Sequence, residues 1–335
     1  MSKLRTAVIG VGHLGRHHAR ILSQIPGAEL AFVVDSDLAR AKSVAETCGA
    51  KPAEDYRKIA GEIDAVTIAS PTLFHFEIAK FFIANKIPVL IEKPITPGLE
   101  QAQELVEFAA KKNVPIQAGH VERFNPAVIA AGKYVRSPKF IECHRLSHFT
   151  FRSTDISAIH DMMIHDIDLV MHFAGAEPLS VDASGACVLT DKIDIANARL
   201  KFPGSCVANL TASRISDKTV RKIRIFSPES CVTIDTQKKS CTVYSKTEKL
   251  KTLLKGKSVP DVDLRNITDL KEFVFKEFIK IEELKVPDEE PLKNELESFV
   301  NSVISGTKPV VSGEQALAAM RVADRILKSI DETCK

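Results

Sequence analysis

A glycine-rich turn directly after an apolar run constrains the fold of this chain more than any other feature. Gly10, Gly12 and Gly15 are spaced as G-x-G-x-x-G and follow the apolar residues Ala7–Ile9. The next residues, Leu14–Ser23, predict a helix. This is the strand, turn and helix context in which such glycine spacing binds a dinucleotide. Without that context the spacing would indicate only a glycine-rich bend at a strand end.

Five residues of the predicted turn are expected to contact the cofactor, and its three glycines have separate roles. Gly10 would form the tight bend, Gly12 would let a pyrophosphate approach the backbone, and Gly15 would let the helix pack against the strand. His13 and Leu14 complete the turn. The free N–H groups at the start of the helix would then face the phosphates of a bound cofactor.

An acidic residue follows at the distance that ribose binding requires. Asp35 closes a second predicted strand, Leu30–Val34, about twenty residues after Gly15. Its carboxylate is placed to accept hydrogen bonds from ribose hydroxyls and would repel the extra phosphate of NADP. NAD is therefore the expected cofactor, with NADP less favoured. Arg40 could soften this preference, and a plain surface turn role for Asp35 stays an alternative.

The order of the predicted elements indicates the fold class. Through the first third of the chain, apolar strand candidates alternate with helices, which predicts β-α-β units and a doubly wound parallel sheet. From about Phe140 the candidates become strands with short connections, interrupted by a helix near 161–173. The sequence thus predicts an α/β protein with a Rossmann domain over residues 1–122. A second domain, built on an antiparallel sheet, would follow over residues 123–335.

Length and composition exclude several classes of protein. The chain has 335 residues, of which 44% are hydrophobic, so disorder is not expected. A net charge of +3 gives no reason to expect a nucleic-acid partner. No apolar run reaches the roughly 18–20 residues of a membrane span, and no secretory signal is recognisable, so we expect a cytoplasmic protein. Seven scattered cysteines without a C-x-x-C pair favour reduced thiols, and no metal is expected.

The loop after the third predicted strand is expected to border the cofactor. Ser70, Pro71 and Thr72 follow the apolar run Ala65–Ala69. Ligands of doubly wound sheets bind outside the carboxyl ends of the strands, and this loop begins there. His75 comes at the start of the next predicted helix. Two interpretations of it stay open, because it could border the cofactor or be an ordinary helix-start histidine.

A charged pair emerges from the fourth predicted strand. Glu92 and Lys93, followed by Pro94, come directly after the apolar Val89–Ile91. This places the pair where a substrate would meet the nicotinamide of a bound dinucleotide. A surface salt bridge is the alternative.

An aspartate and a histidine one helical turn apart form a candidate acid–base pair. Asp161 and His165 are four positions apart, so a helix would place them on one face. The carboxylate could orient the imidazole and raise its basicity. Asp168 and His172 would fall on nearly the same face. A divalent-metal site and a purely structural stripe therefore stay open as alternatives.

Lysines are concentrated between residues 238 and 257. We expect a solvated insertion there, with a flap that attracts phosphate as the alternative.

Taken together, these motifs resemble the Gfo/Idh/MocA oxidoreductases, a family named after glucose–fructose oxidoreductase, inositol dehydrogenase and a rhizopine-catabolism enzyme. The resemblance rests on the glycine turn, on Pro71-Thr72 with His75, on Glu92-Lys93-Pro94, on Asp161 with His165, and on the tail over residues 290–326. It implies a Rossmann domain followed by an α/β domain built on a large, open, mostly antiparallel sheet. That sheet commonly forms the oligomer interface in the family, so a homodimer or homotetramer is implied.

The resemblance also implies roles for three residues. His165 would take the proton of the substrate hydroxyl, with Asp161 orienting its ring. Lys93 would hold the substrate oxygen and stabilise developing negative charge. The hydride would pass to the nicotinamide, which is the cofactor's own chemistry.

Three stretches are most similar to a subgroup of the family that oxidises C3 of UDP-N-acetylglucosamine, namely Gly119–Val128, His144–Asp155 and Met162–Met171. The similarity implies a 3-keto nucleotide sugar as product, which an aminotransferase would convert on the route to 3-amino lipid A. Residues suited to bind such an anionic, polyhydroxylated substrate are Arg123, Asn125, Arg145 and Arg152. For each of these, a surface or interdomain salt bridge is the alternative.

Two other functions stay open. A dehydrogenase of inositol or of another free polyol would use the same catalytic group. A nucleotide-binding sensor would have a degenerate site, and the intact Lys93, Asp161 and His165 argue against it.

Overall fold

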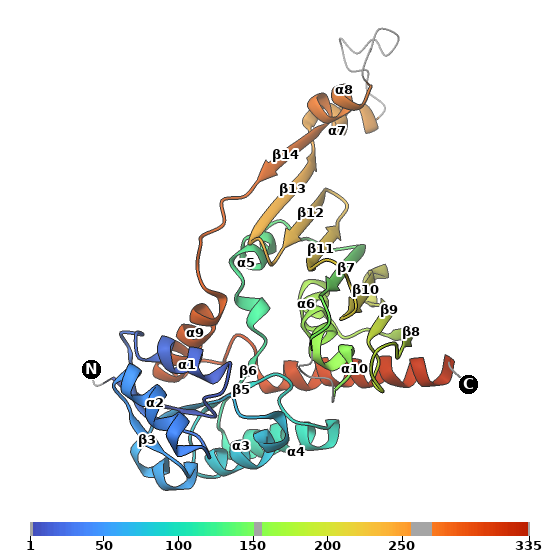
Figure 1. The fold of residues 1–335 in the computed structure, drawn as a ribbon. Coiled ribbons are helices and arrows are strands. Elements are labelled where there is room, and N and C mark those ends of the chain that lie inside the picture. Colours follow the sequence, from blue (N-terminus) through green and yellow to red (C-terminus); the bar gives the residue numbers. More distant parts are fainter. Residues whose placement is uncertain (1–2, 151–155, 256–269, 334–335) are drawn as a thin grey trace. The chain divides into compact units, whose positions relative to one another are not determined.

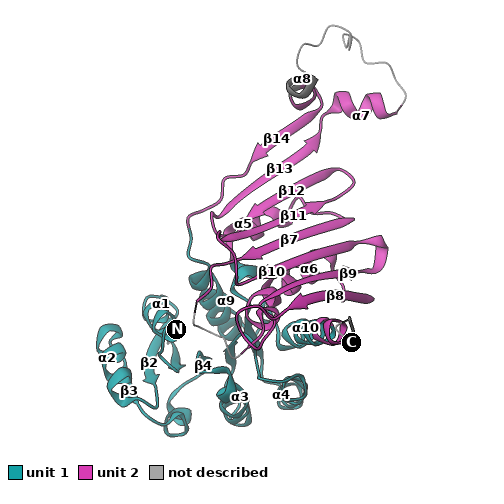
Figure 2. Cartoon of the chain, turned by 45° about the vertical axis from the view of Figure 1, so that its right-hand side comes forward, with its two compact units in different colours: residues 1–124, 289–325 teal, residues 125–288, 326–335 magenta. Residues whose placement is uncertain are grey.

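The chain folds into two compact units. The structure is a computed structural model that describes residues 3–150, 156–255 and 270–333 (Figure 1). Unit 1 comprises residues 1–124 and 289–325, and unit 2 comprises residues 125–288 and 326–335 (Figure 2).

Unit 1 contains a six-stranded, all-parallel sheet in the order β3-β2-β1-β4-β5-β6. This is the Rossmann order, in which successive strands are added on one side of β1 as far as β3 and then, from β4, on the other side. A ligand binds at the carboxyl ends of the strands where this order reverses, between β1 and β4. The prediction of a doubly wound parallel sheet is confirmed. The strands are β1 (Leu4–Ile9), β2 (Ala28–Val34), β3 (Lys51–Ala53), β4 (Ala65–Ile68), β5 (Val89–Glu92) and β6 (Ile116–Gly119).

Helices cover both faces of this sheet (Figure 1). Helices α1, α2 and α9 share one core with it, whereas α3 packs beside α4. Strands β4 and β5 are buried at every position, as expected for parallel strands covered on both faces. The helices are α1 (Gly15–Leu22), α2 (Leu38–Cys48), α3 (His75–Ala84), α4 (Leu99–Lys112), α9 (Pro291–Ser305) and the first part of α10 (Gly313–Thr333).

Residues 289–325 belong to unit 1 although the sequence placed them in the second domain. The reason is the apolar face of α9. Leu296, Phe299 and Val300 are fully buried in the same cluster as Leu22 of α1. Burying side chains of this size stabilises by roughly 1.5–3 kcal/mol each, so the chain returns to complete the first core.

Unit 2 contains an eight-stranded sheet in the order β14-β13-β12-β11-β7-β10-β9-β8. Strands β7 and β10 pair in parallel and all other neighbours are antiparallel. The expected large, mostly antiparallel sheet is thus confirmed. The strands are β7 (Phe140–Leu146), β8 (Ser180–Ala186), β9 (Ile195–Lys201), β10 (Val207–Ser213), β11 (Val220–Phe226), β12 (Ser230–Asp235), β13 (Ser240–Lys246) and β14 (Ile279–Glu283).

The two faces of this sheet differ in chemistry. The buried positions alternate along the strands, as in β9, where every second residue is buried, and α6 (Ile164–Ala174) packs on β7 and β10. The opposite positions carry polar side chains that bond across strands, such as Arg224 Nη1 to Glu142 Oε2 at 3.3 Å. The remaining helices of this unit are α5 (Pro126–Gly132), α7 (Glu248–Leu254) and α8 (Leu270–Glu277).

The lysine-rich segment 238–257 is not the solvated insertion that we expected. Its residues Ser240–Lys246 form β13, which pairs with β12 and β14 inside the sheet. Cys241 and Val243 are buried and alternate with more exposed neighbours, which is the pattern of a half-buried strand. The surrounding lysines obscure this short alternation in the sequence. Residues 256 and 257 lie outside the described part of the chain.

Candidate active site

A cavity of about 840 Å³ in unit 1 lies at the carboxyl ends of β1, β2, β3 and β4. This is the edge where a Rossmann sheet binds its ligand. Six residues predicted to bind the cofactor line it together: Gly10, Gly12, His13, Asp35, Ser70 and Pro71.

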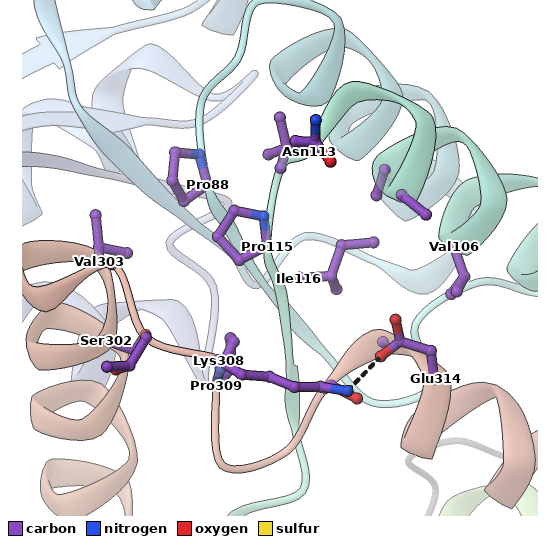
Figure 3. Close-up of a pocket in the computed structure, with 17 residues that line it drawn as sticks. Pro88, Val106, Asn113, Pro115, Ile116, Ser302, Val303, Lys308, Pro309 and Glu314 are labelled. Atoms are coloured by element: carbon purple, nitrogen blue, oxygen red, sulfur yellow. Dashed lines mark ion pairs between the residues drawn. The ribbon is translucent and has the colours of Figure 1, made fainter.

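A second cavity of unit 1, of about 620 Å³, lies at the opposite edge of the sheet (Figure 3). It includes Pro88 and Pro115, which precede β5 and β6, and Lys308 Nζ lies 3.8 Å from Glu314 Oε2 beside it. None of the predicted site residues lines it. Because it borders the amino ends of the strands, it is not the candidate cofactor site.

The glycine turn has the shape that a dinucleotide needs. A Cβ on Gly10, whose φ is +83°, would lie 2.5 Å from Ser70 Cα, and a Cβ on Gly15 would lie 1.8 Å from Gly10 O. Close packing therefore requires both glycines. A Cβ on Gly12 would have no atom within 4 Å. Leu14 is the N-cap residue of α1 and makes no side-chain hydrogen bond to the first turn of the helix. The open space at Gly12 therefore comes just before an N-terminus that no side chain caps, as a phosphate site requires.

Asp35 is fixed in place by the backbone around it. Its Oδ2 accepts a hydrogen bond from Val11 N at 2.9 Å, and its Oδ1 accepts one from Asp37 N at 2.9 Å. Arg40 Nη1 lies 3.3 Å from Oδ1 and balances the charge. The carboxylate is thus pre-oriented at the wall of the cavity while the guanidinium, which is half exposed, stands beside it.

The sequence did not point to residues that follow β3, although they line the same cavity. They are Glu54, Asp55, Tyr56 and Arg57. The Arg57 guanidinium lies 4.7 Å from the centre of the Tyr56 ring, a distance typical of a cation–π contact. Strand β3 is short and contains lysine and proline, so the period-2 signal that could have located its carboxyl end is weak.

His75 does not line the cavity. Its side chain is almost fully buried, with Nδ1 2.9 Å from Pro94 O and Nε2 2.8 Å from Ser70 O. Burial lowers the pKa of His75 below its ordinary value, although the two carbonyls and the charge of Glu92 oppose this. The ring therefore contacts the protein's own backbone. Thr72, also predicted at the cofactor, begins the short 3₁₀ turn Thr72–Phe74.

Glu92 is the last residue of β5 and Lys93 directly follows it, and the Glu92 side chain is buried. Its Oε1 lies 3.0 Å from Nε2 of His18, a fully buried residue of α1, and its Oε2 accepts a hydrogen bond from Lys93 N at 3.2 Å. No spacing in the sequence points to His18, because its partner is 74 positions away. The buried carboxylate fixes the backbone from which the Lys93 side chain emerges.

Unit 2 carries Asp161 on a π-helical turn, Ile159–Met163, that runs into α6. The sequence predicted an ordinary helix there. Asp161 N donates to Ser157 O at 3.0 Å, while Met163 and its neighbour Ile164 are fully buried and anchor the turn. Asp161 and His165 are both half-buried. Insertions of this kind into helices are common at functional sites.

The proposed stripe of two aspartates and two histidines is not continuous. Asp168 is 2% exposed, whereas His172 is an exposed residue near the end of α6. Within the described ranges, no cluster of three or more histidine, cysteine, aspartate or glutamate side chains is arranged to hold a metal ion.

Two of the four residues predicted to bind substrate form contacts within the protein. Arg145 forms a buried ion pair with Asp166, with 2.8 Å between Nη2 and Oδ1. Asn125 caps α5 by accepting from Ala127 N and donates to Thr236 O. Arg123 is buried in the 3₁₀ turn Val121–Phe124 of unit 1. Arg152 lies outside the described residues.

Comparison with known proteins shows the family. Residues 4–120 match the model of the oxidoreductase family with an NAD-binding Rossmann fold, and residues 132–230 match the GFO/IDH/MocA C-terminal domain. The chain is similar to UDP-N-acetylglucosamine 3-dehydrogenase of Acidithiobacillus ferrooxidans, with 34% identity over 95% of this chain and 96% of that one.

One inositol dehydrogenase matches a shorter part of the chain, and solved structures match nearly all of it. Inositol 2-dehydrogenase of Pseudarthrobacter chlorophenolicus is 38% identical over 53% of this chain and 56% of its own. A solved structure of the Acidithiobacillus ferrooxidans enzyme superposes with a TM-score of 0.86 at 30% identity, covering 99% of each chain. A levoglucosan dehydrogenase in complex with NADH and levoglucosan has the same fold, with a TM-score of 0.83 at 16% identity over 99% of this chain and 98% of that one.

The family matches confirm the expectation of an NAD-dependent oxidoreductase. Within the described residues, no helix is long and apolar enough to cross a membrane. The chain belongs to the Gfo/Idh/MocA family of oxidoreductases, whose N-terminal domain is an NAD-binding Rossmann fold.

Proposed function

We propose that this protein oxidises the C3 hydroxyl of UDP-N-acetylglucosamine to a ketone with NAD. The observation that carries the proposal is the similarity to UDP-N-acetylglucosamine 3-dehydrogenase along nearly the whole chain. Inositol 2-dehydrogenase matches at comparable identity over only 53% of the chain. The stretches quoted above as typical of the nucleotide-sugar subgroup all begin within residues 119–162.

The residues that would hold NAD are those of the cavity in unit 1. The open space at Gly12 and the N-terminus of α1 suit the pyrophosphate, and the pre-oriented Asp35 suits the adenosine ribose. The Ser70–Pro71 segment lines the same cavity. When bound, NAD supplies the acceptor for the hydride.

Three residues would act on the sugar. His165 takes the proton of the reacting hydroxyl as general base, and Asp161 orients its ring. Lys93 donates a hydrogen bond to the same oxygen and stabilises the negative charge that develops there. Holding the reacting carbon in place is the protein's main contribution to the rate.

A panel of sugars tests the proposal. The purified protein is incubated with NAD and UDP-N-acetylglucosamine, other UDP-sugars, inositol or free polyols, and the absorbance of NADH is followed. An aminotransferase and glutamate are added as a trap, because an unfavourable equilibrium would hide the keto product. We expect NADH only with UDP-N-acetylglucosamine, and none with the Lys93→Met variant. Protein that binds NAD and yields no NADH with any sugar, even with the trap, contradicts the proposal.

A free-polyol dehydrogenase is the second candidate, and the inositol 2-dehydrogenase similarity favours it. The same panel separates the two, because activity on inositol without activity on UDP-sugars supports this candidate. A sensor with a degenerate site is the third, and unchanged cellular function in a Lys93→Ala strain would support it.

The setting of the reaction follows from the same proposal. The 3-keto product would be aminated by an aminotransferase on the route to 3-amino lipid A, in the cytoplasm. The protein would act as a homodimer or homotetramer joined through the sheet of unit 2, and sedimentation of the purified protein tests this.

A further inference from the structure

His75 contacts two loops at once. Its Nδ1 lies 2.9 Å from Pro94 O and its Nε2 2.8 Å from Ser70 O. Ser70 belongs to the loop that lines the nucleotide cavity, and Pro94 directly follows Lys93. Strands β4 and β5 pair as far as Ile68 with Ile91. Both loops begin beyond that point, where backbone hydrogen bonds between β4 and β5 have ended. The ring of His75 therefore connects the loop after β4 with the loop after β5.

His18 holds the residue on the other side of Lys93. Its Nε2 lies 3.0 Å from Glu92 Oε1 in the interior of unit 1. Among the described residues, its Nδ1 is buried and has no hydrogen-bond partner. A proton on that nitrogen would lack an acceptor and cost desolvation energy. The geometry therefore assigns a proton to Nε2, which donates it in a hydrogen bond to the carboxylate of Glu92.

We propose that His75 and His18 are positioning residues for the reaction proposed above. Together they fix the backbone on both sides of Lys93, and His75 also fixes Ser70 at the cavity. Neither ring is exposed enough to meet substrate, because His18 is 0% and His75 1% exposed. The inference rests on the proposed role of Lys93 in turnover, and on Ser70 as part of the cofactor cavity.

The two contacts of His75 can be tested separately with amide side chains, which place a donor nitrogen at only one of the two ring positions. The amide nitrogen of asparagine occupies the place of Nδ1, and that of glutamine reaches the place of Nε2. A carbonyl only accepts and burial lowers the pKa of His75, so the neutral ring donates to one carbonyl at a time and can serve either through its two tautomers. His75→Asn therefore keeps the bond to Pro94 O, and His75→Gln keeps the bond to Ser70 O.

The experiment measures turnover and NADH affinity of both variants and of His75→Leu, which keeps neither bond. We expect His75→Asn to keep kcat within about threefold and to weaken NADH binding by about tenfold. His75→Gln should show the opposite, with near-normal NADH affinity and kcat lowered by about tenfold or more. His75→Leu should lose both. If the role of His75 were purely structural, all three substitutions would lower the melting temperature, and kcat and NADH affinity would change together.

His18 is tested in parallel with a matched control on the same helix. His18→Leu should lower kcat and leave NADH affinity unchanged, and His18→Gln, whose amide can still donate to Glu92, should recover most of the loss. His17→Leu serves as the control, because His17 is half-buried one position earlier and should leave kcat unchanged.

Two results would overturn the inference. One is folded His75→Asn and His75→Gln variants, as judged by circular dichroism, that change kcat and NADH affinity in the same way. The other is a His18→Leu variant with normal kcat. NADH affinity needs no substrate, so the Ser70 contact remains testable even if UDP-N-acetylglucosamine proves not to be the substrate. A Lys93→Met variant with full activity would refute the role of Lys93, whereas wild-type protein that yields no NADH with any sugar would refute the proposed function.

Discussion

The guanidinium of Arg214 and the carboxylate of Asp194 form a buried ion pair in unit 2, with 2.7 Å between Nε and Oδ1. The carboxylate also accepts hydrogen bonds from the backbone N–H groups of residues 188–190. Arg214 Nη1 donates to Ile156 O at 2.9 Å. The pair thereby joins three segments of chain, one of which leads into the π-helical turn that carries Asp161.

Replacing the carboxylate should destabilise unit 2. Asp194→Asn leaves the Arg214 charge buried without its counter-ion, and breaking a buried pair in this way costs about 3–5 kcal/mol. Urea denaturation followed by circular dichroism measures the change in the free energy of unfolding. Asp182→Asn, at an exposed position of β8, is the matched control and should change stability by less than about 0.5 kcal/mol. Equal stability of the two variants would show that the pair contributes little.

The stabilisation from Asp194 should depend on pH. Burial alone would raise the pKa of this carboxyl, but hydrogen bonds from the backbone of residues 188 and 189, from Arg214 and from Thr190 outweigh it and hold the pKa well below its ordinary value. The unfolded chain takes up the proton near pH 4 and the folded chain only at lower pH. The stability difference between wild type and Asp194→Asn should stay constant above about pH 5 and shrink as the pH falls below 4. A difference that stays constant down to pH 3 contradicts this.

The preference for NAD over NADP should depend on Asp35. Asp35→Ser removes the acceptor for the ribose hydroxyls and the charge that repels a ribose phosphate. Arg40, 3.3 Å from that carboxylate, becomes available to bind the phosphate. We expect the ratio of NADPH to NADH affinity to rise by about tenfold or more. Adding Arg40→Gln should remove the gain for NADPH only. An unchanged ratio in Asp35→Ser would show that Asp35 does not face the ribose.

Much of the fold was predictable because the buried strands are apolar and continuous. The apolar residues of β4 and β5 are buried on both faces, and no helical period competes with them. The two strands at the far edge of the second sheet were missed for the opposite reason. Strand β14 is half-exposed and rich in charge, and the buried Cys241 and Val243 of β13 stand among lysines. Edge strands are commonly charged, which weakens their sequence signal.

The site was predictable where function depends on local geometry. The glycine turn and Asp35 are close in sequence, and one β-α-β unit places them together. The contacts of His18 with Glu92 and of Arg214 with Asp194 were not predictable. Each joins residues that only the completed packing brings together, and a buried histidine in a helix has no spacing that indicates its partner. For the same reason the contacts of Asn125 with Thr236 and of Arg145 with Asp166 were not predicted.

The glycine turn allows a matched pair of substitutions that separates cofactor binding from folding. A Cβ on Gly12 would have no protein atom within 4 Å, so Gly12→Ala should fold normally and place a methyl group where a phosphate must approach. A Cβ on Gly15 would lie 1.8 Å from Gly10 O, a distance that forces the backbone apart. We expect Gly12→Ala to keep the wild-type melting temperature and to bind NADH at least about tenfold more weakly.

Gly15→Ala should behave differently. The melting temperature should fall clearly, since the helix can no longer pack against the strand. Thermal unfolding by circular dichroism and NADH fluorescence titration measure the two quantities for each variant. Gly61→Ala, a substitution with open space around it and outside the cavity, controls for the general effect of replacing a glycine. If Gly12→Ala binds NADH like wild type, the open space at Gly12 does not receive the pyrophosphate, and the cofactor must approach the turn from elsewhere.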